Sequence, residues 1–175
     1  MKKITLLLGL CAIMASCNNQ TKPEGEKKMA DSKPSVENKQ ERNKATAMAS
    51  MEAAGKGDAA GVVKDAASSF AEYLDGSMPP ITNIDSLKGM IGMLLHSIEG
   101  YKASNIMLIA EGDYVSAYAT WNGVFKNDFM GIKANNKPLQ FPDVDIYKFN
   151  EEGKIIEHRS VQNIGAILMA SATSK

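Results

Sequence analysis

The chain has 175 residues, with 20 basic and 20 acidic side chains and a formal net charge of zero. This length suits one small domain with extensions, and the lack of a concentrated basic region argues against a nucleic-acid partner. The two cysteines and two histidines do not form a cluster with metal-ligand spacing, so we expect no metal site and no cofactor.

The first residues, MKKITLLLGLCAIMASC, have the layout of a secretory signal: two lysines, an apolar run too short to span a bilayer, and small residues. Cys17 follows directly, and this order resembles the bacterial lipobox. The resemblance implies that residues 1–16 are a signal peptide and that Cys17 carries the lipid. The alternative is an uncleaved or ordinarily cleaved signal followed by a chance cysteine.

Lipidation would hold the protein on a membrane of the bacterial cell envelope without a membrane-crossing helix. Cleavage also removes Cys11, Lys2 and Lys3 and no acidic residue, so the formal charge moves from zero to minus two. With Cys17 the remaining cysteine, no disulfide is expected in the cleaved protein.

Residues 17–43 are expected to form a disordered tether. They contain two prolines, charges of both signs and scarcely any large apolar residue, a composition that buries too little surface to offset chain entropy. The folded domain is therefore predicted to span residues 44–175.

Two short helices and a third, longer helix are expected at the start of this domain. KATAMASMEAAG (44–55) is rich in helix formers, and Asp58 can cap a second helix over residues 59–70. Residues 70–76 fit a short strand or bent turn that ends before two prolines. Asn83 or Asp85 can then cap a helix whose apolar residues share one face and which ends near Gly100.

Four long strands are expected after the helices, over residues 101–112, 113–126, 137–149 and 153–164. Turn sequences rich in Gly, Asn and Asp separate them. Three helices followed by hairpin-linked strands predict an α+β fold with a curved antiparallel sheet, and such a sheet leaves a concavity.

This order of elements resembles the cone-shaped fold of nuclear transport factor 2-like proteins. Within that group, the stretches FMGIKANNKPLQF, DVDIYKFNEEGKIIEH and NIGAILMA resemble SnoaL-like polyketide cyclases and related ester cyclases. The resemblance implies an acid two residues before the Ile-Gly step and a histidine near the end of the second long strand. This chain has Gln162 and Phe125 there, and neither side chain exchanges protons near neutral pH.

The last strand is predicted to line the concavity. If it alternates without a bulge, Ile156, His158, Ser160 and Gln162 share one face. Glu157 and Arg159 then face solvent or a partner subunit. His158 is either a base oriented by Asp145 or Glu157, or a partly buried histidine without a catalytic role.

Two further features of the strands are candidate parts of a site. Trp121 and Phe125 share a strand face with small residues and form either an apolar slot or ordinary core. Asp143 and Asp145 also share a face, as a carboxylate pair or as edge polar groups.

The leading hypothesis is an envelope protein whose domain binds a small, largely apolar ligand without the acid/base chemistry of the family. The predicted ligand-binding residues are Trp121, Phe125, Asp145, His158, Ser160 and Gln162. The first alternative is an isomerase, cyclase or hydrolase that uses His158 with Asp145 or Glu157. The second is an interaction module that forms a homodimer through its sheet.

Overall fold

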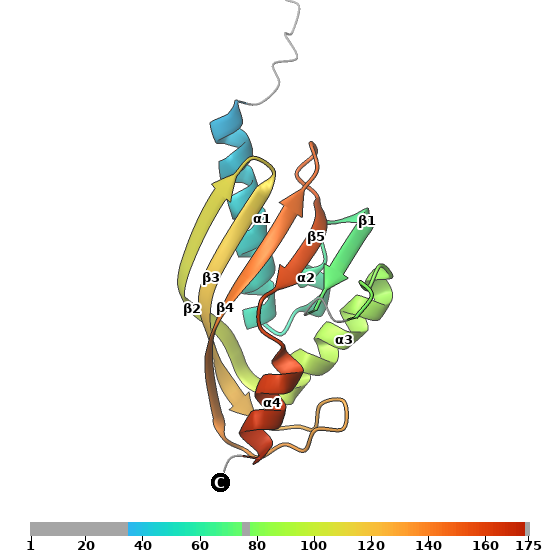
Figure 1. Cartoon of the computed structure of the whole chain (residues 1–175), viewed down its shortest axis with the longest axis vertical. Coiled ribbons are helices and arrows are strands. Elements are labelled where there is room, and N and C mark those ends of the chain that lie inside the picture. Colours follow the sequence, from blue (N-terminus) through green and yellow to red (C-terminus); the bar gives the residue numbers. More distant parts are fainter. Residues whose placement is uncertain (1–34, 75–77, 174–175) are drawn as a thin grey trace, which may run out of the picture. The chain divides into compact units, whose positions relative to one another are not determined.

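Five strands form one sheet in the order β1-β5-β4-β3-β2, with helices packed against it (Figure 1). The computed structural model describes residues 35–74 and 78–173, and these residues belong to one compact unit. The predicted signal peptide, Cys17 and most of the predicted tether lie outside the described residues.

Helix α1 (Val36–Gly55) begins before the predicted domain boundary at residue 44. The Ser35 side chain caps it by accepting a hydrogen bond from the Asn38 amide at 3.3 Å. Lys39 Nζ lies 2.7 Å from Asp113 Oδ1, and the buried Asn43 also belongs to this part of the helix. Residues 36–43, which we expected in the tether, are therefore part of the folded domain.

The predicted second helix is wrong beyond its first turn. Asp58 caps α2 (Ala59–Val62) by accepting from the Gly61 amide at 2.9 Å, but strand β1 (Ala66–Tyr73) starts within the predicted helix. β1 pairs in parallel with the distant strand β5, and this pairing overrides the local helical preference. The sheet is therefore antiparallel at every neighbouring pair except this one.

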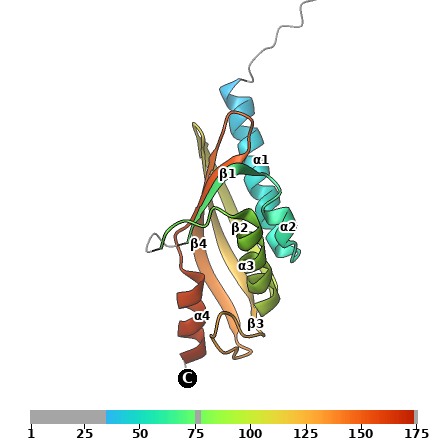
Figure 2. The same ribbon diagram turned by 90° about the vertical axis from the view of Figure 1, so that its right-hand side faces the viewer.

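Helix α3 (Ile84–Ser97) is capped by Asn83, which is one of the two caps predicted from the sequence. The four predicted long strands are present as β2 (Ile98–Glu111), β3 (Tyr114–Phe125), β4 (Pro138–Phe149) and β5 (Ile155–Ser160). Seen from the side, α1, α2 and α3 lie on one side of the sheet (Figure 2).

Strand β5 is shorter than predicted because the chain turns into helix α4 (Ile164–Thr173). Asn163 Oδ1 accepts from the Ala166 amide at 2.9 Å at the start of this helix. Across the described residues, no helix combines the length and apolar character needed to cross a membrane.

Strand β5 also contains a bulge, which changes the set of residues that share a face with His158. Tyr147 pairs with His158 and Lys148 with Glu157, but Phe149 pairs with Ile155. Ile156 is the extra residue of this bulge, so Ile155 shares the side of His158. The expectation that Ile156 would do so was wrong, because it assumed strict alternation.

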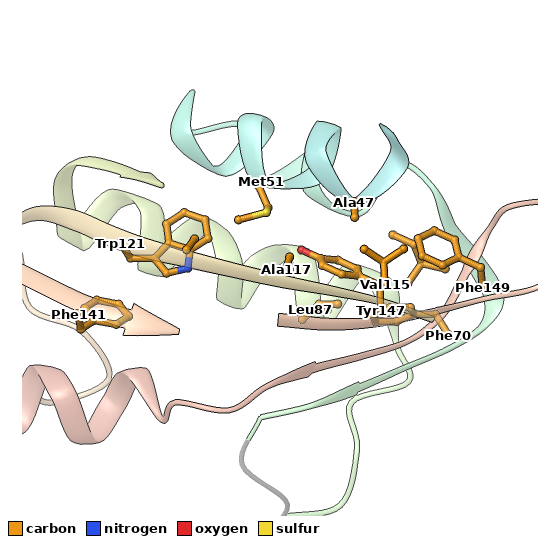
Figure 3. Packing of buried hydrophobic residues seen from close by; sticks show 12 residues of the cluster. Ala47, Met51, Phe70, Leu87, Val115, Ala117, Trp121, Phe141, Tyr147 and Phe149 are labelled. Carbon is orange, nitrogen blue, oxygen red and sulfur yellow. The ribbon is translucent and has the colours of Figure 1, made fainter. Parts of the chain in front are cut away.

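The main core lies between the inner face of the sheet and the helices. Figure 3 shows Ala47 and Met51 of α1 above Ala117, Val115 and other residues of the sheet. A second cluster lies toward the other end of the strands and contains Ile98, Phe125, Phe129, Leu139 and Leu168. Burial of each large apolar side chain contributes roughly 1.5–3 kcal/mol of stability relative to exposure.

Candidate functional site

A cavity of about 330 Å³ lies between the sheet and the helices. Most of its wall is apolar, with Met51 of α1, Leu87 and Ile91 of α3, and Trp121 and Phe141 of the sheet among the lining residues. Cavities of this size and polarity are typical of small-molecule sites, which combine an apolar wall with a few polar groups.

The polar groups of the cavity come from neighbouring positions on three adjacent strands. The register places Glu72 of β1 beside His158 of β5, and His158 beside Tyr147 of β4. One row further, Ser160 lies beside Asp145. Residues paired in this way point to the same face of a sheet, so the two acids and the histidine meet on the cavity side.

His158 lies between two carboxylates. Its Nδ1 is 2.9 Å from both carboxylate oxygens of Glu72, and its Nε2 is 3.4 Å from Asp145 Oδ1. The second contact is an ion pair without hydrogen-bond geometry, since Nε2 has no hydrogen-bond partner among the described residues. The ring also packs against Tyr147, with ring centroids 4.6 Å apart.

The charge of His158 follows from these neighbours. Burial by itself lowers the pKa of the imidazole, but the negative charge of Glu72 and the contact with Asp145 outweigh it and raise the pKa to about 10. His158 is therefore an imidazolium at neutral pH. It can donate a proton or stabilise negative charge, but it is not a ready base.

Asp143 lies on the same face of β4 as Asp145. It is hydrogen-bonded to Ser160, the last residue of β5, and to Gln162, which follows this strand. Its carboxylate lies 2.6 Å from Ser160 Oγ and accepts from the amides of Gln162 and Val144 at 3.0 and 2.7 Å. Burial raises the pKa of Asp143, and the charge of Asp145 adds to this, although the hydrogen bonds act in the opposite direction. Ser160 Oγ also lies 2.9 Å from the Gln162 carbonyl oxygen, so its single hydroxyl proton can be donated either to Asp143 or to this carbonyl.

An aromatic pair forms part of the cavity wall. The rings of Tyr101 and Trp121 are stacked, with centroids 4.6 Å apart and planes 7° apart. Burial, with the charges of Asp145 and Asp143, raises the pKa of the Tyr101 hydroxyl well above its usual value. Tyr101 is therefore neutral across the physiological pH range.

The model of the SnoaL-like polyketide cyclase family matches residues 45–170. The chain belongs to this family. The match covers all five strands and most of the described helices, and it confirms the family that the strand motifs suggested. A comparison with curated proteins found no match.

Solved structures with this fold support the same architecture. A candidate polyketide cyclase from Xanthomonas campestris pv. campestris is 19% identical, with a TM-score of 0.67 over 77% of this chain and 99% of that chain. A candidate SnoaL-like polyketide cyclase from Jannaschia sp. CCS1 is 16% identical, with a TM-score of 0.68 over 78% and 95%. AclR, a candidate hydroxylase from Streptomyces galilaeus, is 20% identical, with a TM-score of 0.65 over 78% and 99%. At these identities the likeness confirms the α+β, nuclear transport factor 2-like fold.

Five of the six predicted ligand-binding residues line the cavity of this family member. They are Trp121, Asp145, His158, Ser160 and Gln162. Gln162, at the position where the family resemblance implied an acid, contributes its backbone amide to Asp143. The acids of this cavity come instead from β4 and β1.

Phe125 is the exception, and its prediction was wrong. It is fully buried in the second cluster with Leu168 of α4 and does not line the cavity. We predicted no helix or strand after residue 164, which left Phe125 uncovered. Because the C-terminal residues form α4, this end of the sheet is packed solid.

Glu157 is also excluded as the partner of His158. Its carboxylate accepts from Arg159 Nε at 2.7 Å, and the Arg159 guanidinium lies 3.7 Å from the centre of the Tyr73 ring. Glu157 does not line the cavity. The predicted pairing of His158 with Asp145 agrees with the geometry, and the predicted pairing with Glu157 does not.

Glu72 was missed. It lies two residues after Phe70 in β1, and both side chains are buried. The signal that could have identified Glu72 is an acidic residue at a strand position that faces inward. It could not be read from the sequence because the limits of β1 and its parallel pairing with β5 depend on contacts between distant residues.

Proposed function

We propose that the domain binds a small, largely apolar molecule in the cavity between its sheet and helices. The observation that carries this proposal is the combination of an apolar wall with a polar cluster at one place, Glu72, His158 and Asp145. Such an arrangement holds an apolar body by burial and fixes its orientation through few polar groups.

Filling the cavity provides the test. Ala54 lines the cavity from α1, whereas Ala49 is exposed on the same helix. Native mass spectrometry of the purified protein should detect a bound small molecule in the parent and in Ala49→Phe, and much less in Ala54→Phe. Equal occupancy of all three proteins would show that the molecule binds elsewhere and would refute the proposal.

A second candidate function is proton transfer on the bound molecule, as in an isomerase or cyclase. It is favoured by the position of His158 beside Asp145 on the cavity side of the sheet. Asp145 would remove a proton from carbon next to a carbonyl group, and the imidazolium would stabilise the negative charge on the carbonyl oxygen.

This second function predicts that the protein accelerates hydrogen–deuterium exchange next to the carbonyl of small cyclic ketones, measured by NMR. Asp145→Asn should abolish the acceleration, while Asp113→Asn, in the turn before β3, should keep it. Exchange that is no faster with the parent protein than with Asp145→Asn would remove proton transfer as a function of this site.

We further propose that lipid on Cys17 anchors the protein to a membrane of the bacterial cell envelope. The support is the order of residues at the start of the chain, with small residues directly before Cys17. Cys17→Ala should move the protein from the membrane fraction to the soluble fraction and abolish incorporation of labelled palmitate. Continued lipid labelling of Cys17→Ala would contradict this proposal.

We also propose that the protein forms a homodimer through the outer face of the sheet. Met107, Ile109, Tyr114 and Tyr118 are exposed, and the pairing of Met107 with Tyr118 places them on the face opposite the buried Val115 and Ala117. Exposed apolar patches often mark protein interfaces. Light scattering should therefore give a dimer for the parent and a monomer for Ile109→Glu, and a monomeric parent at high micromolar concentration would contradict it.

A further inference from the structure

The cavity contains more carboxylates than cations. Its described lining residues include Glu72, Asp143 and Asp145 but no lysine and no arginine, and His158 is the one basic group. Glu72 and His158 form a close ion pair. One carboxylate therefore remains in excess even when Asp143 is protonated, and two remain when it is ionised.

Asp145 is the carboxylate with unused acceptor capacity. It is 5% exposed, and among the described residues His158 is the one ionic or hydrogen-bonding partner found for its carboxylate. Its contact with a cation is the 3.4 Å separation from His158 Nε2, whose ring is already held by Glu72 at 2.9 Å. A buried carboxylate gains most from a donor that also carries positive charge.

The surroundings of Asp145 also suit a cation. Phe141, Asp143 and Asp145 alternate along β4 on the cavity side, and Phe141 pairs with Trp121 of β3. Trp121 is stacked on Tyr101. Aromatic faces near a carboxylate attract ammonium groups through their quadrupoles, while the apolar residues of α3 accommodate a hydrocarbon body.

We infer that the cavity selects a primary amine, with its ammonium group at Asp145 and its apolar body against the aromatic pair and α3. This inference rests on the proposed ligand-binding function and names the ligand class. Carboxylates of the same shape are rejected, because they would place a like charge beside Asp145 and Asp143.

Three probes with one body and different head groups test the inference: cyclohexylmethylamine, cyclohexylmethanol and cyclohexanecarboxylate. Isothermal titration calorimetry at pH 7 should show the amine binding about tenfold more tightly than the alcohol, the difference expected between a charge-assisted and a neutral hydrogen bond. The carboxylate should bind more weakly than the alcohol.

Variants locate the source of the preference. Asp145→Asn should reduce the ratio of amine to alcohol affinity about tenfold, whereas Asp113→Asn, a matched change outside the cavity, should leave that ratio unchanged. Asp143→Asn, expected to reduce the ratio less, replaces Asp145→Asn if circular dichroism shows that the latter does not fold.

The outcomes separate this inference from the proposal on which it rests. Equal binding of amine and alcohol, or tighter binding of the carboxylate, would overturn the amine preference and leave ligand binding intact. Binding of none of the three probes would count against both. An amine preference that Asp145→Asn and Asp143→Asn both retain would also overturn the inference, because the ammonium group would then lie elsewhere.

Discussion

The inner face of the sheet is hollow beside Asp145 and solid around Phe125, and these two regions are called the hollow end and the solid end. At the hollow end, β3 presents the small residues Ala117 and Ala119, and the cavity contains the charged cluster of Glu72, His158 and Asp145. At the solid end, Phe125 packs against Leu168 with no exposed surface. The same face of one sheet therefore provides stability in one region and the proposed binding site in the other.

The largest expected effect is on the free energy of unfolding, and it comes from the difference in packing between the two ends. Phe125→Ala should destabilise the protein by about 3–5 kcal/mol, because it leaves a void in a filled cluster. Phe141→Ala, at the cavity wall, should cost less because its side chain already adjoins empty space. Urea unfolding measures both, and equal losses would show that the two ends do not differ in packing.

At the hollow end, charge pairing replaces part of the packing. Glu72→Gln removes one partner of a buried ion pair and leaves His158 with a weaker counter-charge. We expect a loss of roughly 3 kcal/mol in the free energy of unfolding. Glu157→Gln, which affects the outward pair with Arg159, should change stability by less than about 1 kcal/mol, and a similar cost for both would contradict the special role of Glu72.

Only the hollow end should respond to mildly alkaline pH. The pKa of His158 is raised from 6.5 to about 10 in the folded protein. A raised pKa means that the folded state holds the proton more tightly, so its stabilising contribution is complete below about pH 6.5 and is lost as the pH rises toward 10. Urea unfolding should show declining stability across this window, by at most about 1.4 kcal/mol per pH unit.

His158→Gln is the control for this pH dependence. It removes the titrating group, so the decline between pH 6.5 and 10 should flatten. A parent protein whose stability stays constant over this window, or a variant that keeps the full decline, would show that His158 is not held as an imidazolium.

The smallest effect tests whether the hollow end has room. Ile91→Phe adds volume at the cavity wall on α3 and should change the free energy of unfolding by less than about 1 kcal/mol. Leu168→Phe adds the same kind of volume to the solid end and should cost about 1–3 kcal/mol through overpacking. If Ile91→Phe proves the more costly of the two in thermal unfolding, the cavity is smaller than the structure indicates.

The contrast also explains which features could be read from the sequence. Short turns join β2 to β3 and β4 to β5, so local signals such as Gly112 with φ of +56° and Gly153 with φ of +80° mark the ends of these strands. These strands, the caps at Asp58 and Asn83, and the fold class were therefore predictable. The family motifs lie in the same part of the chain.

The remaining features depend on contacts between distant residues. The parallel pairing of β1 with β5 brings Glu72 to His158, and neither the pairing nor the bulge at Ile156 has a local signal. Helix α4 follows a strand directly, so its apolar sequence fits either structure. Missing α4 led to the incorrect placement of Phe125, and missing β1 concealed Glu72.

The central claim is that the hollow end binds a small, largely apolar molecule beside the charged cluster. Trp121 is the single tryptophan of the chain and lines the cavity, so its fluorescence reports directly on occupancy. Titration with cyclohexylmethylamine and cyclohexylmethanol should change this emission saturably in the parent and in Ala49→Phe, but not in Ala54→Phe. Emission that no probe changes, or that changes equally in Ala54→Phe, would contradict the claim.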